Sequence, residues 1–297
     1  RDRYQEATVY DANSYFGSVE KKINNQHSLN FTAFYTPNRR GRSTAITQEV
    51  RDFKGITYNP NWGYQGDEKR SSRIREVKEP VIMLNHYWTF GEKTSLNTNI
   101  AYQFGKIGNT RLDNGGNRNP SGNYYQKLPS YFLRNENPSP YDFQQAYIAE
   151  QEFINDGQLD WNSFYEGNTI AGNSTYAIQE DRVDDTQFTF NSILTTSISE
   201  NILVNGTLNY RNLKSENFAV LKDLLGGKGV LDKDPFGPRG EESNSDLQNP
   251  NRIVKEAERY KYNYQLNASV LSGFVQGQFN YKKVDYYIGL APSSLLW

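Results

Sequence analysis

The segment that decides the fold is residues 95–105, which read SLNTNIAYQFG. Successive side chains of a β-strand point to opposite faces, so this segment would have one apolar wall and one amide-rich wall. The apolar wall would hold Leu96, Thr98, Ile100, Tyr102 and Phe104, and the other would hold Asn97, Asn99, Ala101 and Gln103. The segment therefore predicts a two-faced strand.

The same alternation recurs along the chain in four pairs of segments, each pair joined by a short polar turn. The pairs are 12–20 with 28–36, 79–90 with 95–105, 184–198 with 202–213, and 274–281 with 284–290. Between the pairs lie three long stretches rich in Gly, Pro, Asn and charge, at 37–78, 106–183 and 214–258. Outer-membrane barrels have this organisation, with short periplasmic turns and long extracellular loops.

The alternation alone leaves two architectures open. A soluble sandwich would bury the apolar face and turn the amide face to water. A membrane barrel would turn the apolar face to lipid and the amide face to a wet lumen. The barrel is favoured by the Asn, Gln and Thr of the polar face, by strands longer than the usual five or six residues, and by aromatic residues near strand ends. We expect an all-β, antiparallel, up-and-down transmembrane β-barrel.

The composition fits this expectation. The chain has 297 residues, no Cys, a net charge of −1 and a mean hydropathy of −0.83, yet it contains 22 Tyr and 16 Phe. This many aromatic residues argues against disorder. No stretch is long and apolar enough for a transmembrane helix, whereas a barrel strand needs only one apolar face. A nucleic-acid partner is not expected, because such proteins carry a basic excess.

Two groups of residues are candidates for a site. Aromatic residues in the polar loops would stack on a ligand or, alternatively, pack the loops together. They are Trp62, Tyr64, Tyr124, Tyr125, Trp161, Phe164 and Tyr165. Amide and hydroxyl residues of the polar strand faces would line a lumen. They are Asn97, Asn99, Gln103, Asn205, Thr207, Asn209, Gln276 and Gln278.

Local signals in the long stretches predict some further structure. A helix is expected at 140–155, with Ser139 as N-cap and Pro140 at its first position. A helical turn is expected at 221–225, ended by Gly226. Three aspartates, Asp181, Asp184 and Asp185, would terminate a strand or line the mouth of the lumen.

Catalytic and metal-binding patterns are weak. His27 and His86 are the two histidines of the chain, too few for a His-based zinc site, and no nucleophile or phosphate-binding motif occurs. Acidic residues around Asp232 and Asp234 could bind calcium or simply be solvated. A basic loop from Arg39 to Arg75 would meet acidic lipopolysaccharide or an acidic ligand, or be solvated. We expect no enzyme activity, no metal and no cofactor.

Several runs resemble TonB-dependent receptors of Bacteroidetes, of the group with a carboxypeptidase-regulatory-like extension. The resemblance is carried by 15–23 (YFGSVEKKI), 34–41 (FYTPNRRG), 83–88 (MLNHYW), 101–106 (AYQFGK), 156–162 (DGQLDWN) and 249–252 (NPNR). It implies a 22-stranded barrel closed by an N-terminal plug, with a TonB box that couples import to the proton-motive force.

Against that pattern, residues 1–297 would be one partial barrel domain of about eight strands. We expect the chain to lack the plug and the TonB box, and we expect residues 291–297 to be a foreign or truncated tail, since Pro292 interrupts the strand before Trp297. Such a chain would be an open sheet with two unpaired edges, unable to transport anything by itself.

The leading functional hypothesis is TonB-dependent import across the outer membrane of a ligand too large or scarce for porins. Its partners would be outer-membrane lipid, the TonB complex through the absent N-terminal part, and a surface lipoprotein lid. The alternatives are a secreted or surface-exposed β-sheet module that binds glycans and an autonomous eight-stranded pore or anchor. Siderophore, cobalamin, oligosaccharide and peptide all remain open as ligands.

Overall fold

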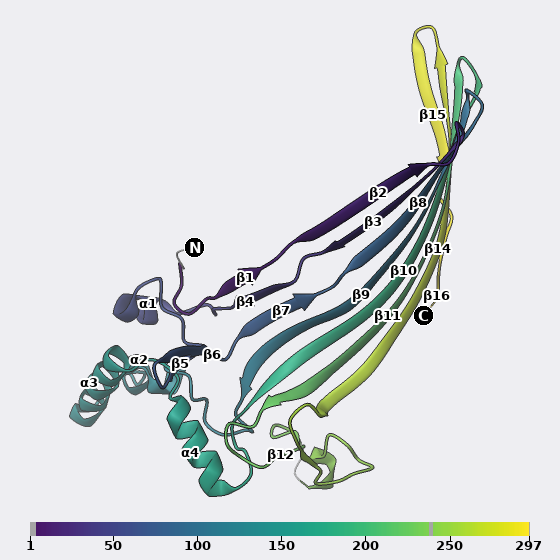
Figure 1. Ribbon diagram of the computed structural model, residues 1–297. Helices are drawn as coiled ribbons and strands as arrows, with labels where there is room; N and C mark the ends of the chain where they lie inside the picture. Colours follow the sequence, from purple (N-terminus) through teal and green to yellow (C-terminus); the bar gives the residue numbers. More distant parts are fainter. Residues whose placement is uncertain (1–3, 238–239, 297) are drawn as a thin grey trace.

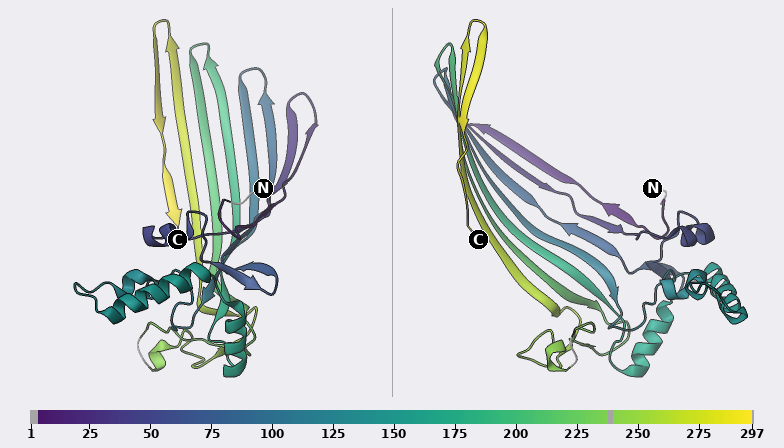
Figure 2. Two further views of the ribbon diagram at one scale, coloured as in Figure 1. Left: turned by 90° about the vertical axis from the view of Figure 1, so that its left-hand side faces the viewer. Right: turned by 180° about the vertical axis from the view of Figure 1, so that it is seen from behind.

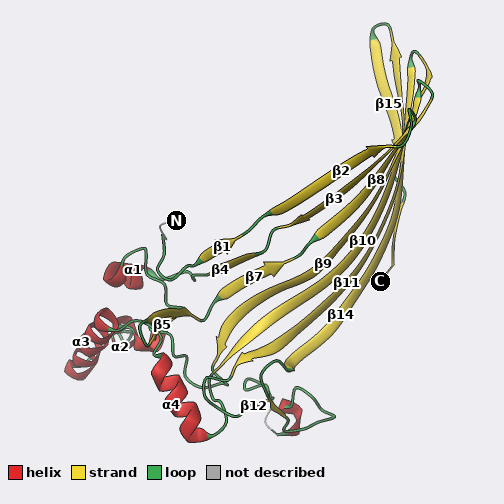
Figure 3. Ribbon diagram, in the orientation of Figure 1, coloured by secondary structure: helices red, strands yellow, loops and turns green. Residues whose placement is uncertain are grey.

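The computed structural model describes residues 4–237 and 240–296, so Arg1 and Trp297 lie outside the described residues. Its main feature is a curved, open 12-stranded sheet (Figures 1 and 2). Every strand pairing in this sheet is antiparallel. Short turns lie at one end of the strands and folded loops at the other, as Figure 3 shows most clearly.

All four predicted hairpins are present. They are β2 (Tyr15–Lys22) with β3 (His27–Tyr35), β8 (Val81–Phe90) with β9 (Thr94–Asp113), β10 (Ala177–Ser199) with β11 (Ile202–Asp223), and β14 (Arg259–Tyr281) with β15 (Val284–Leu290). Neighbouring hairpins also pair with each other, β3 with β8, β9 with β10 and β11 with β14.

The strands reach further toward the loop end than the sequence indicated. Strand β9 continues to Asp113, β10 begins at Ala177, β11 ends at Asp223 and β14 begins at Arg259. In these extensions polar or charged residues occur on both faces beside buried apolar residues such as Ile178 and Leu221, so the strict alternation stops while the backbone ladder continues. The long loops are correspondingly shorter. The predicted helical turn at 221–225 is wrong, because residues 221–223 end β11.

The first hairpins are extended by separate short strands. Strand β1 (Tyr10–Ala12) pairs with β4 (Asn38–Gly41), which pairs with β7 (Ile74–Lys78), and β7 joins β9. At the other edge, β16 (Ser293–Leu296) pairs with β14 beyond the end of β15. The break between β15 and β16 falls at Ala291 and Pro292, where the sequence predicted an interruption. The foreign or truncated origin of the tail stays a prediction.

The loop end contains several small elements. They are α1 (Gln48–Lys54), β5 (Trp62–Gln65), β6 (Glu68–Ser71), η1 (Tyr125–Lys127), α2 (Pro129–Phe132), α3 (Pro140–Asn155), α4 (Trp161–Ala171), β12 (Val230–Leu231), η2 (Glu241–Ser243) and β13 (Ile253–Val254). The predicted helix at 140–155 is confirmed as α3, and Ser139 and Asp142 form a capping box at its start. Within the described residues, no helix combines the length and the apolar character that a membrane crossing requires.

Cross-strand register sorts the sheet into two faces, and the two differ in exposure. One row of the apolar face runs Thr98, Ser192, Leu208, Gly273, with rows of larger apolar residues beside it. Many of the exposed large hydrophobic residues lie on this face. They include Phe31, Ile82, Leu84, Ile100, Tyr102, Leu194, Leu208, Leu271, Val275 and Ile288. A sheet of this kind needs an apolar surrounding on one side.

Candidate ligand-binding face

The polar face of the sheet carries a row of asparagines across five neighbouring strands. Asn30, Asn85, Asn99, Asn191 and Asn209 stand directly opposite one another in turn. The Asn85 amide donates to Asn30 Oδ1 at 3.1 Å, and the Asn99 amide donates to Asn191 Oδ1 at 3.2 Å. Asn191 in turn donates to Asn209. The face is thus a hydrogen-bonded polar surface, which we call the inner face.

All eight residues that the sequence assigns to a lumen lie on this inner face. Asn97, Asn99 and Gln103 are in β9, Asn205, Thr207 and Asn209 in β11, and Gln276 and Gln278 in β14. Each is half-buried, whereas the opposite face exposes its large side chains. That these eight residues line a lumen stays a prediction.

Toward the loop end, the inner face carries a network of which the sequence indicated only Asp181, as a candidate to line the mouth of the lumen. We call it the inner-face network; it consists of Arg111, Asp113, Gln179, Asp181, Tyr260, Lys261 and Tyr262. At its centre, Lys261 Nζ lies 2.8 Å from Asp113 Oδ2 and donates to Gln179 Oε1 at 2.9 Å. Gln179 is fully buried, so these bonds satisfy a side chain that water cannot reach.

The second half of the network is centred on a carboxylate. Arg111 Nε lies 3.1 Å from Asp181 Oδ2, and the Tyr262 hydroxyl donates to Asp181 Oδ1 at 2.9 Å. Burial, with the nearby Asp113 charge, raises the pKa of Tyr260, so its hydroxyl stays a donor to Gln179 at 3.2 Å. The network therefore presents fixed charges and hydroxyls on a wall of the sheet.

A β-bulge places Lys261 in this network. The register of β14 against β11 passes from Asn263 to Tyr260 while β11 advances by one residue, so Lys261 and Tyr262 have no partner across the ladder. Lys261 has a φ of 62°, a conformation that costs a non-glycine residue energy. The backbone N–H of Lys261 donates to the buried Asp232 at 3.0 Å, which helps to hold this conformation. Bulges commonly re-aim side chains beside functional sites.

The network borders a cavity of about 370 Å³. Arg111, Asp113, Lys261 and Tyr262 line it on the sheet side. Residues 233–236, from the loop between β12 and η2, close it on the other side. A cavity of this volume and lining accommodates a small polar group of a ligand, held by charged and hydroxyl side chains.

The predicted loop aromatics divide into buried and accessible groups. Trp161 is fully buried, and Phe164 and Trp62 are almost so, at 6% and 4% exposure. Trp161 and Phe164 belong to a core with Leu159, Ile178 and Leu225, against which Tyr165 packs. These residues therefore pack the loops together, which was the alternative to stacking on a ligand. Tyr64 and Tyr125 are more than half exposed and Tyr124 is half-buried, so a ligand-stacking role for these three stays a prediction.

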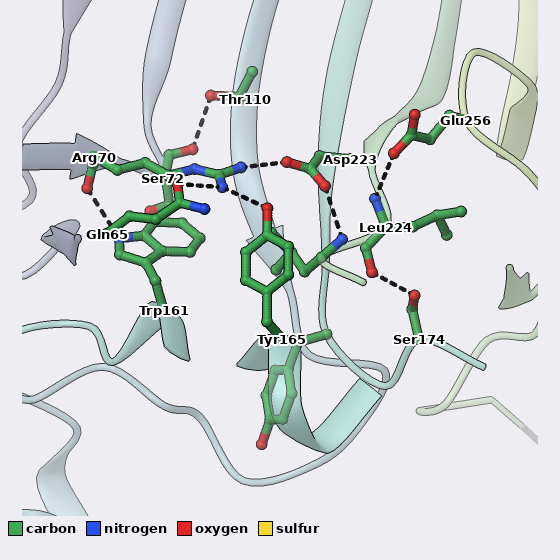
Figure 4. Close-up of polar contacts among 12 residues, drawn as sticks. Gln65, Arg70, Ser72, Thr110, Trp161, Tyr165, Ser174, Asp223, Leu224 and Glu256 are labelled. Carbon is green, nitrogen blue, oxygen red and sulfur yellow. Dashed lines mark hydrogen bonds and ion pairs between the residues drawn. The ribbon is translucent and has the colours of Figure 1, made fainter. Parts of the chain in front are cut away.

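Arg70 ties the loop core to the end of β11 (Figure 4). Its guanidinium lies 2.5 Å from Asp223 Oδ2 and donates to the Tyr165 hydroxyl at 3.0 Å and to Gln65 at 2.9 Å. It also covers the Trp161 ring, with 4.4 Å from the guanidinium carbon to the ring centroid. One residue of the predicted basic loop is thus structural.

A larger cavity of about 900 Å³ lies among the loops, beside α3. Gln145, Ile148 and Glu152 of one helix face line it, together with Tyr147. The opposite wall comes from residues 118–127 and 156–160. Its mixture of amides and apolar surface is of the kind found in pockets for organic ligands.

The remaining candidates have local roles. His27 Nδ1 and His86 Nε2 lie 3.0 Å apart on the apolar face, stacked beside Trp88. The three aspartates lie within β10 and do not end it; Asp181 faces inward and Asp184 outward. Among residues 4–237 and 240–296, no group of three or more His, Asp or Glu is placed to hold a metal ion.

Comparison with solved structures identifies the fold. The chain aligns over 99% of its length with P. aeruginosa FpvA, in a complex with a pyoverdine and iron, at a TM-score of 0.54 and 9% identity. It also aligns with the E. coli K12 ferric-catecholate import receptor Fiu, in its open form, over 97% (TM-score 0.47, 12% identity). A third match is the RagAB peptide transporter, over 96% (TM-score 0.46, 10% identity).

The chain spans only part of the matched chains, 31% of that of FpvA, 36% of that of Fiu and 28% of that from RagAB. The sequence matches no protein-family model and no curated protein. The likeness to FpvA extends over nearly the whole sheet and its loops. The fold is therefore that of an antiparallel outer-membrane β-barrel wall, as predicted, here open because the described strands do not close on themselves.

Proposed function

We propose that this chain is part of the barrel of a TonB-dependent receptor of the Bacteroidetes type, which imports a ligand across the outer membrane. The observation that carries the proposal is the two-faced wall that aligns with FpvA over 99% of this chain. Its apolar face is exposed along the strands, and its polar face carries the asparagine row and the inner-face network.

In this proposal the strands cross the membrane, with the short turns in the periplasm and the loop region outside the cell. Ligand is held at the loop end, by the inner-face network and the cavity beside it. The half-buried amides further down the inner face line the path toward the periplasm. Residues 1–297 act as one part of the barrel domain.

The energy for import would come from the inner membrane through the TonB complex, which would contact a part of the receptor other than this wall. A surface lipoprotein lid is a further proposed partner, on the loop side. No covalent step is involved, because the work is binding and release. The inner-face network favours this import role over the glycan-binding surface module, because its charges face the polar side of a membrane-type wall.

The test uses the complete gene product with an epitope tag between Asn135 and Glu136, within an exposed loop stretch that precedes α3. We expect the protein to fractionate with outer membranes and the tag to bind antibody on intact cells. Growth on a limiting nutrient should then depend on both this gene and TonB. A protein found in the soluble fraction would contradict the proposal.

A further inference from the structure

The outer face of the sheet shows where the membrane would begin and end. On β10 this face runs from Phe188 through Phe190 and Leu194 to Ile198. At about 3.3 Å per residue and a tilt of about 40°, these positions span roughly 25 Å of height, which is the apolar band of an outer-membrane barrel. The first charged residues above it, toward the loops, are Asp184 on β10 and Lys106 on β9, which stand opposite each other.

A belt of charge follows directly above this band. Its cations outnumber its carboxylates. The cations are Arg39, Lys78, Lys106, Arg182, Lys214, Lys222 and Arg259, and the carboxylates are Asp11, Glu76, Glu180, Asp184 and Glu216. We call this set the outer belt.

Two carboxylates of the outer belt are shared between cations, and one cation, Arg182, pairs with both Glu180 and Asp184. Glu216 lies 2.8 Å from Lys214 Nζ and 3.0 Å from an Arg259 nitrogen. Glu180 lies 3.4 Å from Arg182 and 3.6 Å from Lys222 Nζ. A carboxylate that serves two cations neutralises only one of them. The lysine side chains keep about half of their surface exposed, 49% for Lys214 and 52% for Lys222.

The excess of positive charge in the outer belt is concentrated at one pair of lysines. Lys78 of β7 and Lys106 of β9 stand directly opposite each other in the ladder. Like charges in that position destabilise a sheet unless an anion lies between or beside them. Lys78 has Glu76 at 2.7 Å. Lys106 also stands opposite Asp184, but that carboxylate is paired with Arg182 at 2.7 Å, and Lys106 forms no ion pair within the described part of the chain. The site therefore has room for a further anionic group.

We propose that the outer belt binds the phosphate groups of lipids in the outer leaflet of the membrane, with Lys78 and Lys106 as its principal contacts. The inference rests on the proposed function, because it needs the apolar band to lie in a bilayer. The level of the belt fits a lipid headgroup, since it begins where the apolar band ends. The shape also fits, because cations in several neighbouring strands can meet several phosphates at once.

The test compares variants of the complete gene product extracted from outer membranes in mild detergent. Lys78→Gln with Lys106→Gln removes two cations from the belt. Lys282→Gln with Lys283→Gln makes the same change of charge at the turn end of β14 and serves as the control. Lipid phosphorus bound per protein is then measured, together with heat-modifiable mobility as a check of folding.

We expect at least a twofold loss of bound phosphorylated lipid in the belt variant and none in the turn-end variant. Equal binding in the belt variant and the unmodified protein, or an equal loss in both variants, would overturn the inference. If the unmodified protein is not in the outer membrane, the proposed function fails. The belt is then tested by flotation of the same proteins with lipid A vesicles against phosphatidylcholine vesicles, where equal flotation of all three proteins on lipid A overturns it.

Discussion

The strand wall and the loop region of this chain are stabilised in opposite ways. The loop region buries apolar clusters; Trp161 and Leu225 are completely covered in one, together with Ile178 of β10, and Val50 in another. Among the residues that the structure describes, the wall has no such cluster between the turns and the outer belt; Leu208, Leu271 and Val275 remain about half exposed there. The loop region can thus hold its shape through internal contacts, whereas the wall depends on lipid and on neighbouring strands.

The largest expected effect concerns the loop core. Trp161→Ala removes a fully buried ring that packs on Phe164 and under Arg70, and should cost about 3–5 kcal/mol of local stability. We expect α4 to become sensitive to protease while the strands keep their heat-modifiable mobility. Trp161→Phe, which retains a ring, should be milder. Loss of the strands together with α4 would show that the two regions are one cooperative unit.

The second effect concerns the two faces of the wall. Leu208 lies near the middle of the apolar band, and its neighbour Thr207 lies on the inner face. Leu208→Lys should destabilise the inserted barrel by about 2–4 kcal/mol, as cations do at the bilayer midplane. Thr207→Lys should cost much less, because its ammonium would be in a polar lumen. Denaturant titration in lipid vesicles measures both, and equal costs would contradict the two-faced wall.

The third effect concerns the junction between the regions. Arg70 and Asp223 connect β6 to the end of β11, and both side chains are less than one-third exposed. A double-mutant cycle with Arg70→Ala and Asp223→Ala should give a coupling of about 1–2 kcal/mol. Hydrogen exchange at the loop end of β11 provides the readout. Purely additive losses would show that the bond does not join the regions.

The smallest effect is a dependence on pH at the start of α4. Hydrogen bonds from Ser163 lower the pKa of Asp160. A lowered pKa in the folded state means that the stabilisation is present above the unfolded value of about 3.9 and is lost as pH falls through the folded value. Asp160→Asn keeps an N-cap side chain that does not titrate. Asp160→Ala removes the cap and should lower the stability of the helix by about 1 kcal/mol at neutral pH.

The measurement is hydrogen exchange of the first α4 amides between neutral pH and acid. We expect protection to fall in acid for the unmodified chain and to stay constant for Asp160→Asn. The same fall in both proteins would assign the pH dependence to another group.

Sequence alone predicted the hairpins, because alternation over the apolar band is a local signal that each strand carries by itself. It also predicted α3, through Ser139 and Pro140. It missed the strand extensions above the band, where polar, charged and buried apolar residues follow one another without strict alternation while the backbone ladder continues. Propensity at 221–225 suggested a helical turn, and pairing with β10 prevailed.

Less of the candidate site could be predicted from the sequence. The inner-face network joins Asp113, Gln179 and Lys261, residues far apart in the chain that a sheet register brings together. The bulge that re-aims Lys261 leaves no local pattern, since the segment around it reads as a plain alternating strand. The sequence located the loop aromatics, but it could not show which of them are buried and which are exposed, because this depends on how the loops pack together.

The central claim is that one face of the wall contacts lipid and the other does not. The chain has no cysteine, so single cysteines can be placed at each position from 96 to 104 of β9 in the complete protein and spin-labelled in the membrane. We predict that oxygen, which concentrates in lipid, reaches the label at even positions, with little access at odd positions. Access that does not alternate, or that alternates in the opposite phase, would contradict the account.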